Sequence, residues 1–236
     1  MTYTILGRCP RTGQLGIGIA IFSLAVGGYC PYIRPDLAVV SSQASANPQL
    51  GIKAIQLLEN GIPLKNVMEE LKKHDQYFTY RQIGVVDKEG SAVVHTGIQT
   101  LPWRGHTTGD GYAAMGNNLD SENVVQAMAM TFEDTIEQDL ETRLLMSLES
   151  GRDAGGQQSS YPDWANQDRS AALIVFEREE YPMIDLRVDS HRAAIQKLRQ
   201  LRDEYKPYVP WYYKLRVEQP DKAPRHTEFL AQMKRT

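Results

Sequence analysis

The chain has 236 residues, of which 42% are hydrophobic and 23% are charged, as is typical of a soluble globular protein. Its net charge of −3 argues against a nucleic-acid partner or an acidic membrane surface, because both attract basic proteins. Its two cysteines, Cys9 and Cys30, indicate no disulfide framework and favour a reducing, cytoplasmic location. We expect no signal peptide, and the apolar run 17–28 is too short to span a bilayer.

The first part of the chain predicts strands followed by helices. Residues 2–8 and 15–22 are rich in β-formers and flank a segment with Pro and Gly, which predicts a hairpin. A third strand is expected at 36–43. Apolar residues at helical spacing then predict two helices, at 49–61 and 63–75.

The same alternation continues to the C-terminal part of the domain. A second hairpin is expected at 81–97, and 111–119 suggests a short strand with a loop. Further elements are expected in chain order as helices at 121–135 and 138–151, a loop at 155–168, strands at 169–178 and 182–191, and a helix at 191–206.

Helices therefore come in pairs between groups of strands, rather than singly after each strand as in a doubly wound parallel sheet. This order predicts an α+β fold of four αββα layers, with two antiparallel sheets stacked between helices. We expect one domain over residues 1–205 and a Pro-rich, aromatic tail over 206–236. The tail is expected either to wrap the domain or a neighbouring subunit, or to fray.

Several motifs resemble, in order, those of an uncharacterised bacterial and archaeal family that is grouped with the N-terminal-nucleophile (Ntn) hydrolases. The resemblance implies the same αββα sandwich, but no established activity. It runs from Thr2 to about Tyr205. The stretches that carry it are TYTILGRCPRTGQLGIGIA, SSQASANPQLG, RQIGVVDKEGSAVVHTG, GHTTGDGYAAMGNNL, RSAALIVF and DLRVDSH.

In the Ntn superfamily, the first residue of the mature chain is a Thr, Ser or Cys nucleophile, and its own α-amine is the general base. The resemblance therefore implies Thr2 as the nucleophile, after a methionine aminopeptidase has removed Met1. The alternative is that Thr2 is only a β-branched residue opening an edge strand. If Met1 stays, the amine of Thr2 is held in a peptide bond and this mechanism cannot operate.

The resemblance also implies roles for other positions. Arg34 would lie near the nucleophile and lower the pKa of its amine, although Arg cannot itself accept a proton. Asn117 would lie near the amine, backbone N–H groups in 42–46 would bind an oxyanion, and Asp168 would support the nucleophile. The simpler interpretation of Arg34 is a surface charge.

Candidate substrate-binding residues are weighed against ordinary structural roles. Ser23 would face the cleft or be a hydrogen-bonded core hydroxyl. Gln43 and Asn47 flank a turn before Pro48, where Asn is a common choice. His95 is a further candidate, but the histidines lack a metal-ligand spacing, so we expect neither metal nor cofactor.

We therefore expect a hydrolase of an amide bond in a small molecule or short peptide, with Thr2 as nucleophile. The alternative is a non-catalytic protein of the same fold that binds a small ligand or a partner enzyme. A weaker option is a hydrolase that uses an internal group such as Ser23 or His95. Apolar surface on the tail and at the sandwich ends favours a homo-oligomer.

Overall fold

The computed structural model describes residues 1–158 and 168–233. Its contacts divide the chain into two compact units, Met1–Arg199 and Gln200–Thr236. The loop expected at 155–168 falls largely outside the described residues. Among the residues described, no helix is both long enough and apolar enough to cross a membrane.

The strands of the first unit form two antiparallel sheets, whose orders are β10-β9-β2-β1-β8-β7 and β3-β4-β5-β6. The six-stranded sheet contains β1 (Thr2–Arg8), β2 (Leu15–Ile21), β7 (Arg104–Gly109), β8 (Tyr112–Asn117), β9 (Ser170–Phe176) and β10 (Ile184–Val188). The four-stranded sheet contains β3 (Pro31–Arg34), β4 (Ala38–Ala44), β5 (Arg81–Asp87) and β6 (Ala92–Thr96).

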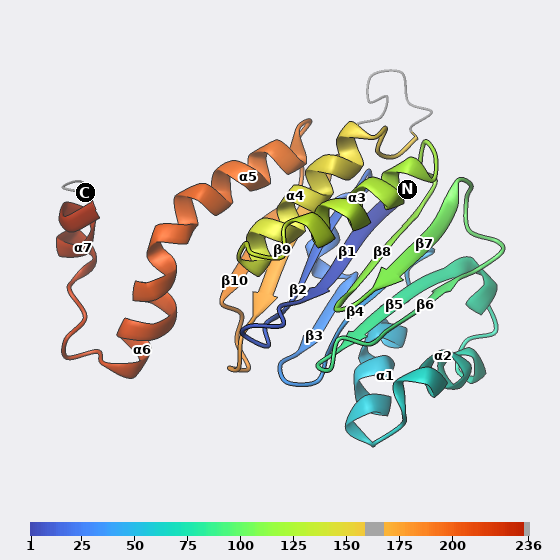
Figure 1. Ribbon diagram of the computed structural model, residues 1–236, viewed down its shortest axis with the longest axis horizontal. Helices are drawn as coiled ribbons and strands as arrows, with labels where there is room; N and C mark the ends of the chain where they lie inside the picture. Colours follow the sequence, from blue (N-terminus) through green and yellow to red (C-terminus); the bar gives the residue numbers. More distant parts are fainter. Residues whose placement is uncertain (159–167, 234–236) are drawn as a thin grey trace. The chain divides into compact units, whose positions relative to one another are not determined.

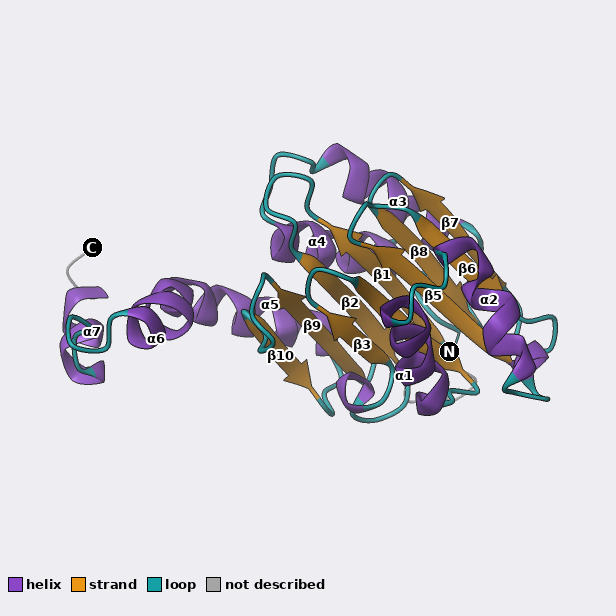
Figure 2. Ribbon diagram, turned by 90° about the horizontal axis from the view of Figure 1, so that it is seen from below, coloured by secondary structure: helices purple, strands orange, loops and turns teal. Residues whose placement is uncertain are grey.

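Two helix pairs cover the outer faces of the two sheets (Figures 1 and 2). The helices are α1 (Pro48–Glu59) and α2 (Leu64–Lys73) on the four-stranded sheet, and α3 (Asn123–Asp134) and α4 (Leu140–Asp153) on the six-stranded sheet. A further helix, α5 (Ala194–Tyr205), follows β10. The predicted αββα sandwich is confirmed, and each helix pair falls at the expected place in the chain.

Two strands, β3 and β7, are not predicted from the sequence, and both lie at sheet edges. Strand β3 is only four residues long and starts at Pro31, a residue that normally argues against a strand. Strand β7 is polar, rich in Gly and Thr, and only partly buried. An edge strand need not alternate hydrophobic with polar residues, so neither segment carries the usual signal.

The C-terminal unit contains helical turns where the sequence analysis expects only a Pro-rich tail. They are η4 (Lys206–Tyr208), the π-helix η5 (Pro210–Leu215), α6 (Arg216–Glu218) and α7 (His226–Met233). Pro is tolerated here because it stands in the first turn of its helix, where no intrahelical N–H is needed. Inside this unit the ring of Trp211 stacks on Phe229 with 5.0 Å between centroids.

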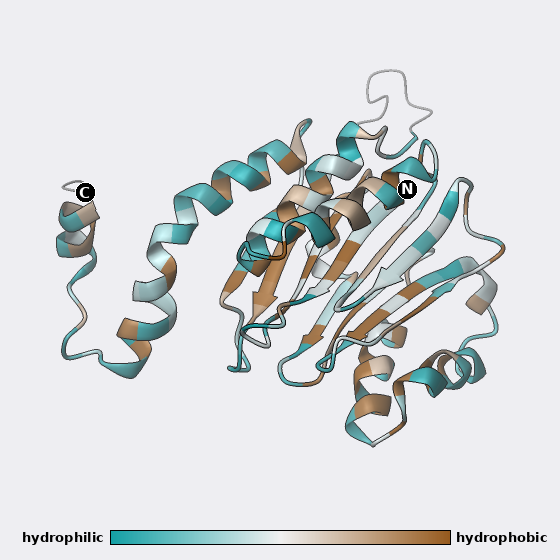
Figure 3. Cartoon of the chain, in the orientation of Figure 1, coloured by the Kyte–Doolittle hydropathy of each residue, from teal (hydrophilic) through white to brown (hydrophobic). Residues whose placement is uncertain are grey.

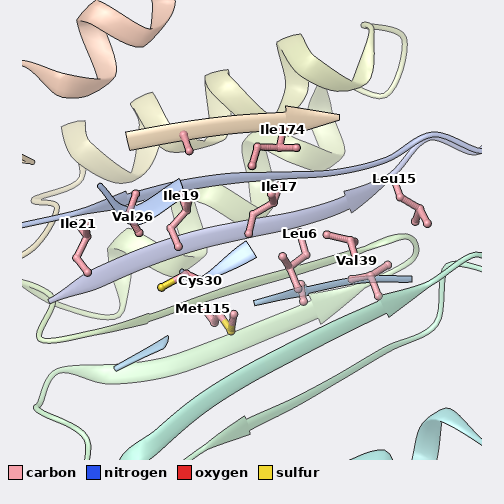
Figure 4. Packing of buried hydrophobic residues seen from close by; sticks show 13 residues of the cluster. Leu6, Leu15, Ile17, Ile19, Ile21, Val26, Cys30, Val39, Met115 and Ile174 are labelled. Carbon is pink, nitrogen blue, oxygen red and sulfur yellow. The ribbon is translucent and has the colours of Figure 1, made fainter. Parts of the chain in front are cut away.

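A core of apolar side chains joins the two sheets. Leu6 and Ile17 of the six-stranded sheet and Val39 of the four-stranded sheet belong to one buried cluster, whose members are drawn in Figure 4. The hydropathy colouring of Figure 3 distinguishes the core from the surface: residues along β9 are hydrophobic, whereas residues along α5 are mostly hydrophilic. Burial of these strand faces is what holds the sandwich together.

Replacing Leu6 with Ala tests how much this core contributes. Leu6 is fully buried, so we expect Leu6→Ala to lower the free energy of unfolding by about 2–5 kcal/mol, through lost transfer energy and a residual cavity. Urea unfolding of wild type and variant measures the difference. Ile98→Ala is the control, because Ile98 is 71% exposed. Equal losses in the two variants would contradict this account of the core.

Candidate functional site

The space between the sheets is apolar along most of its length but polar where β1 begins. Successive side chains of a strand point to opposite faces, so Thr2, Thr4 and Leu6 share the face of β1 that is turned to the four-stranded sheet. Across the β1–β8 ladder, Thr2 lies opposite Asn117 and Thr4 opposite Met115. Polar side chains therefore gather at the start of β1, and apolar ones follow.

A chain of buried hydrogen bonds links the two sheets at this polar end. The Thr4 hydroxyl donates to Oε1 of Gln43 at 2.6 Å, and the Ser41 hydroxyl donates to the same oxygen at 3.0 Å. Nε2 of Gln43 donates to Oε1 of Gln82 at 2.9 Å, and Nδ2 of Asn117 donates to that oxygen at 3.0 Å. We call these five side chains (Thr4, Ser41, Gln43, Gln82, Asn117) the amide network.

The N-terminal amine of the chain is hydrogen-bonded to one member of this network. The α-amine of Met1 donates to Oδ1 of Asn117 at 2.9 Å. Burial removes water from the ammonium form and lowers the pKa of the Met1 amine to about 6. The nearby Cys30 thiol stays neutral, because burial raises its pKa to about 12. An amine with such a pKa is largely uncharged at neutral pH and can accept a proton.

The hydroxyl of Thr2 stands out from its surroundings. Thr2 is fully buried, and its Oγ1 has no hydrogen-bond partner within the described part of the chain. A buried hydroxyl without a partner costs about 1–3 kcal/mol, which makes such groups rare. A hydroxyl, an adjacent amine of lowered pKa and an amide oxygen that holds the amine are the groups that nucleophilic attack on a carbonyl needs.

Comparisons with known proteins give the chain its family. The model of a family of unknown function, DUF1028, matches residues 2–198. The chain belongs to the DUF1028 family. None of the curated proteins matches it.

Solved structures that resemble the chain include the following two. Protein SPO2555 from Silicibacter pomeroyi, a DUF1028 protein, is 28% identical and has a TM-score of 0.78, over 87% of this chain and 89% of that one. Anbu (ancestral beta-subunit) from Yersinia bercovieri is 10% identical with a TM-score of 0.41, over 88% of this chain and 96% of that one.

In this DUF1028 chain, several expected site residues come together at the start of β1. Asn117 contacts the N-terminal amine, and Gln43 lies in the amide network. Ser23 is exposed in the loop after β2, two residues beyond Ile21, the ladder partner of Thr2. The backbone oxygen of Ser23 accepts a hydrogen bond from the Ser170 hydroxyl at 2.7 Å.

Arg34 has other partners. It ends the edge strand β3, where its guanidinium pairs with Glu59 at 3.0 Å and with Glu180 at 3.1 Å. Neither carboxylate belongs to the amide network. The structure thus gives Arg34 the geometry of a surface ion pair, with about half of its side chain exposed.

The segment expected to supply an oxyanion site is also engaged locally. The N–H of Ser42 donates to the Cys30 carbonyl and that of Ser45 to the Tyr80 carbonyl. Both donors are thereby committed to backbone partners in the folded chain.

Asn47 and His95 make structural contacts. Asn47 caps α1 by accepting a hydrogen bond from the Gln49 N–H, as its place before Pro48 predicts. His95 on β6 stacks on the Phe78 ring, and its Nε2 lies 3.0 Å from the Phe78 carbonyl oxygen. Burial lowers the pKa of this imidazole. Among the residues described, no cluster of three His, Cys, Asp or Glu side chains could hold a metal ion.

Asp168 lies on the opposite face of the six-stranded sheet from Thr2. It accepts hydrogen bonds from the Tyr3 hydroxyl at 2.5 Å and from Nε2 of Gln157 at 2.7 Å. Tyr3 follows Thr2 directly, so its side chain points to the helix layer, where it lies beside Gly151 of α4. Asp168 therefore makes no side-chain contact with Thr2.

A cavity of about 510 Å³ lies on this helix side of the sheet, between α4 and the start of α5. Asp168 lines it together with Glu149, Arg152, Arg192 and Arg199, and Arg199 pairs with Glu149 across it. The cavity is thus separated from Thr2 by the six-stranded sheet.

The sequence analysis missed Thr4, Ser41 and Gln82. Thr4 and Gln82 leave a signal in hindsight, because each is a polar residue within a strand that is otherwise buried, and Thr4 shares the face of Thr2 by the two-residue period. That the two lie on facing strands of different sheets is a tertiary fact that single strands do not reveal.

The buried carboxyl of Asp168 makes stability depend on pH. Burial raises its pKa to about 6, although the hydrogen bonds from Tyr3 and Gln157 oppose the rise. The folded chain therefore keeps a proton that the unfolded chain releases near pH 4. Because the folded state binds more protons between about pH 4 and 6, this group lowers the free energy of unfolding as pH rises through that interval.

We expect Asp168→Asn to remove this loss, since its amide oxygen still accepts from Tyr3. The free energy of unfolding of the variant relative to wild type should rise by roughly 1–3 kcal/mol between pH 4 and pH 6.5. Urea unfolding across this range measures it. Asp134→Asn, at an exposed position of α3, is the control. A difference that is flat with pH would show that Asp168 is ionised throughout.

Proposed function

We propose that this DUF1028 protein is an Ntn-type hydrolase of an amide bond in a small molecule or short peptide. Thr2 is the nucleophile once Met1 has been removed, and the α-amine of Thr2 is the general base. The observation that carries the proposal is the fully buried Thr2 hydroxyl, which has no hydrogen-bond partner among the described residues and stands directly after the chain's terminal residue.

The chemistry needs no further group to move protons. The Thr2 amine takes the proton from Oγ1 while the oxygen attacks the amide carbon, and the same proton then passes to the departing amine as the C–N bond breaks. The resulting ester on Oγ1 is hydrolysed by water, with the amine as base again. Met1 must be absent, because in its presence the Thr2 nitrogen is a peptide nitrogen without basicity.

Two features support the base. Burial lowers the pKa of the Met1 α-amine to about 6, and the same loss of hydration at the start of β1 would suit a Thr2 amine working as a base at neutral pH. Asn117 is the ladder partner of Thr2 and holds the terminal amine through Oδ1, so it is suited to orient the base. The sequence resemblance to Ntn hydrolases agrees with this arrangement.

A second candidate is a non-catalytic protein of the same fold that binds a small ligand. It applies if Met1 is retained, because the Met1 amine then makes the hydrogen bond to Asn117 and the Thr2 nitrogen is a peptide nitrogen. The presence of Met1 in the mature protein therefore decides between the two functions. A homo-oligomer stays a prediction under either one.

Intact-protein mass spectrometry on untagged material tests the nucleophile. We expect a mass lower by one Met, and a covalent adduct on Thr2 after treatment with a β-lactone, because the activated hydroxyl opens the strained ester. Peptide mapping localises the adduct.

Matched variants sharpen this experiment. Thr2→Ser keeps the hydroxyl and should keep the adduct, whereas Thr2→Val keeps the shape, leaves Met1 removable and should lose the adduct. Retention of Met1 without an adduct would favour the binding function. An adduct that persists in Thr2→Val would identify a different nucleophile.

The pH dependence of adduct formation tests the base. Only the uncharged amine accepts the Thr2 proton, so the rate should rise with pH and level off above the pKa of the amine. Because burial lowers that pKa, we expect the plateau below the ordinary α-amine value of about 7.7–8.0. The reaction is quenched at set times at each pH from 5 to 9, and mass spectrometry of the adduct gives the rate. A rate that continues to climb to pH 9 would exclude an amine of lowered pKa as base.

A further inference from the structure

We propose that Gln82, on β5 of the facing sheet, is a positioning residue for the N-terminal amine. It acts by fixing which end of the Asn117 carboxamide faces that amine. The inference rests on the proposed function only where it gives the amine a role in catalysis. How Gln82 positions the amine does not depend on that role.

The argument starts from groups that can only accept hydrogen bonds. Nε2 of Gln82 lies 2.9 Å from the carbonyl oxygen of Gly116 and 3.1 Å from that of Gly105. A backbone carbonyl cannot donate, so the NH₂ end of the Gln82 amide must face these two oxygens. The Thr96 hydroxyl, at 3.0 Å, is a third acceptor for the same nitrogen.

The opposite end of the Gln82 amide is therefore an oxygen that needs donors. It receives them from Nε2 of Gln43 and Nδ2 of Asn117. With Nδ2 of Asn117 committed to Gln82, its Oδ1 points the other way, where it accepts from the N-terminal amine. Two backbone carbonyls thus set the direction of every amide between them and the chain's terminus.

This direction matters for the amine. Were the Asn117 carboxamide rotated by half a turn, its NH₂ group would face the amine; it could donate to the lone pair of the uncharged form, but in the charged form a donor would meet a donor. Gln82 is fully buried and Asn117 is 2% exposed, so water cannot replace Gln82 as the partner of Nδ2 of Asn117. Holding Oδ1 in place orients the amine and partly stabilises its charged form, which opposes the desolvation that lowers its pKa.

The test uses two substitutions with different chemistry at one position. Gln82→Met is close in shape but has no amide, so Asn117 loses its partner. The amine should then lose its acceptor, and its pKa should fall by about one unit. Gln82→Glu, with its buried carboxyl protonated so that the O–H donates to the Gly116 carbonyl, retains an oxygen facing Nδ2 of Asn117, so the pKa of the amine should stay at or above the wild-type value.

The readout is the pH midpoint for acylation of the terminal α-amine by a small succinimidyl ester, followed by mass mapping of the N-terminal peptide. Gln14→Met is the matched control, because Gln14 is also buried but contacts Met183 instead of the amide network. We expect its midpoint to equal that of wild type. In an Asn117→Ala background, Gln82→Met should produce no further shift, because Gln82 acts through Asn117.

An unchanged midpoint in Gln82→Met, an equal fall in Gln82→Glu, or a further fall in the Asn117→Ala background would overturn the inference. Circular dichroism checks folding. If Gln82→Met does not fold, Gln82→Glu decides alone, and a midpoint below wild type rejects the role. Failure of the proposed function looks different: the β-lactone adduct is then absent from wild type while the midpoint shifts occur as expected.

Discussion

Strand β1 is hydrogen-bonded along both edges and covered on both faces, so each of its side chains must be satisfied inside the protein. On one face Thr4 is hydrogen-bonded to the amide network, and farther along Leu6 packs in the apolar core. On the other face, beneath α4, Tyr3 is hydrogen-bonded to Asp168. The pleat of a single strand therefore separates two polar clusters that are adjacent in sequence, and only the first of them faces the terminal amine.

Buried amides are costly unless all their donors and acceptors are used, and a fully connected network instead rigidifies the core around it. Gln82 and Gln43 meet this condition by joining both sheets at one point. Thr2 is the exception, since its hydroxyl is buried without a partner among the described residues. An unpartnered hydroxyl next to a well-satisfied network is in keeping with the role proposed for Thr2.

Much of the fold could be predicted because local signals agree with it. The first hairpin has its turn at Gly13, whose φ of 76° suits glycine, and α1 begins after the cap residue Asn47. The residues of the site are harder to predict from the sequence. Asn117 and Gln43 lie there as expected, but Arg34 and Asp168 contact other residues, because their positions depend on which sheet and which face they occupy. The role of Gln82 depends on sheet-to-sheet register, which local periodicity does not encode.

The pairing of β1 with β8 also determines when, during synthesis of the chain, the start of β1 can be enclosed in the sheet. The first residues to leave the ribosome form an inner strand whose neighbour, β8, ends only at Asn117. Until that partner has been synthesised, the start of the chain has one free edge and an amine open to solvent. Afterwards the amine is held by Asn117 and largely shielded. If Met1 is removed, as the proposed function requires, the nascent chain presents it most openly, before β8 pairs with β1.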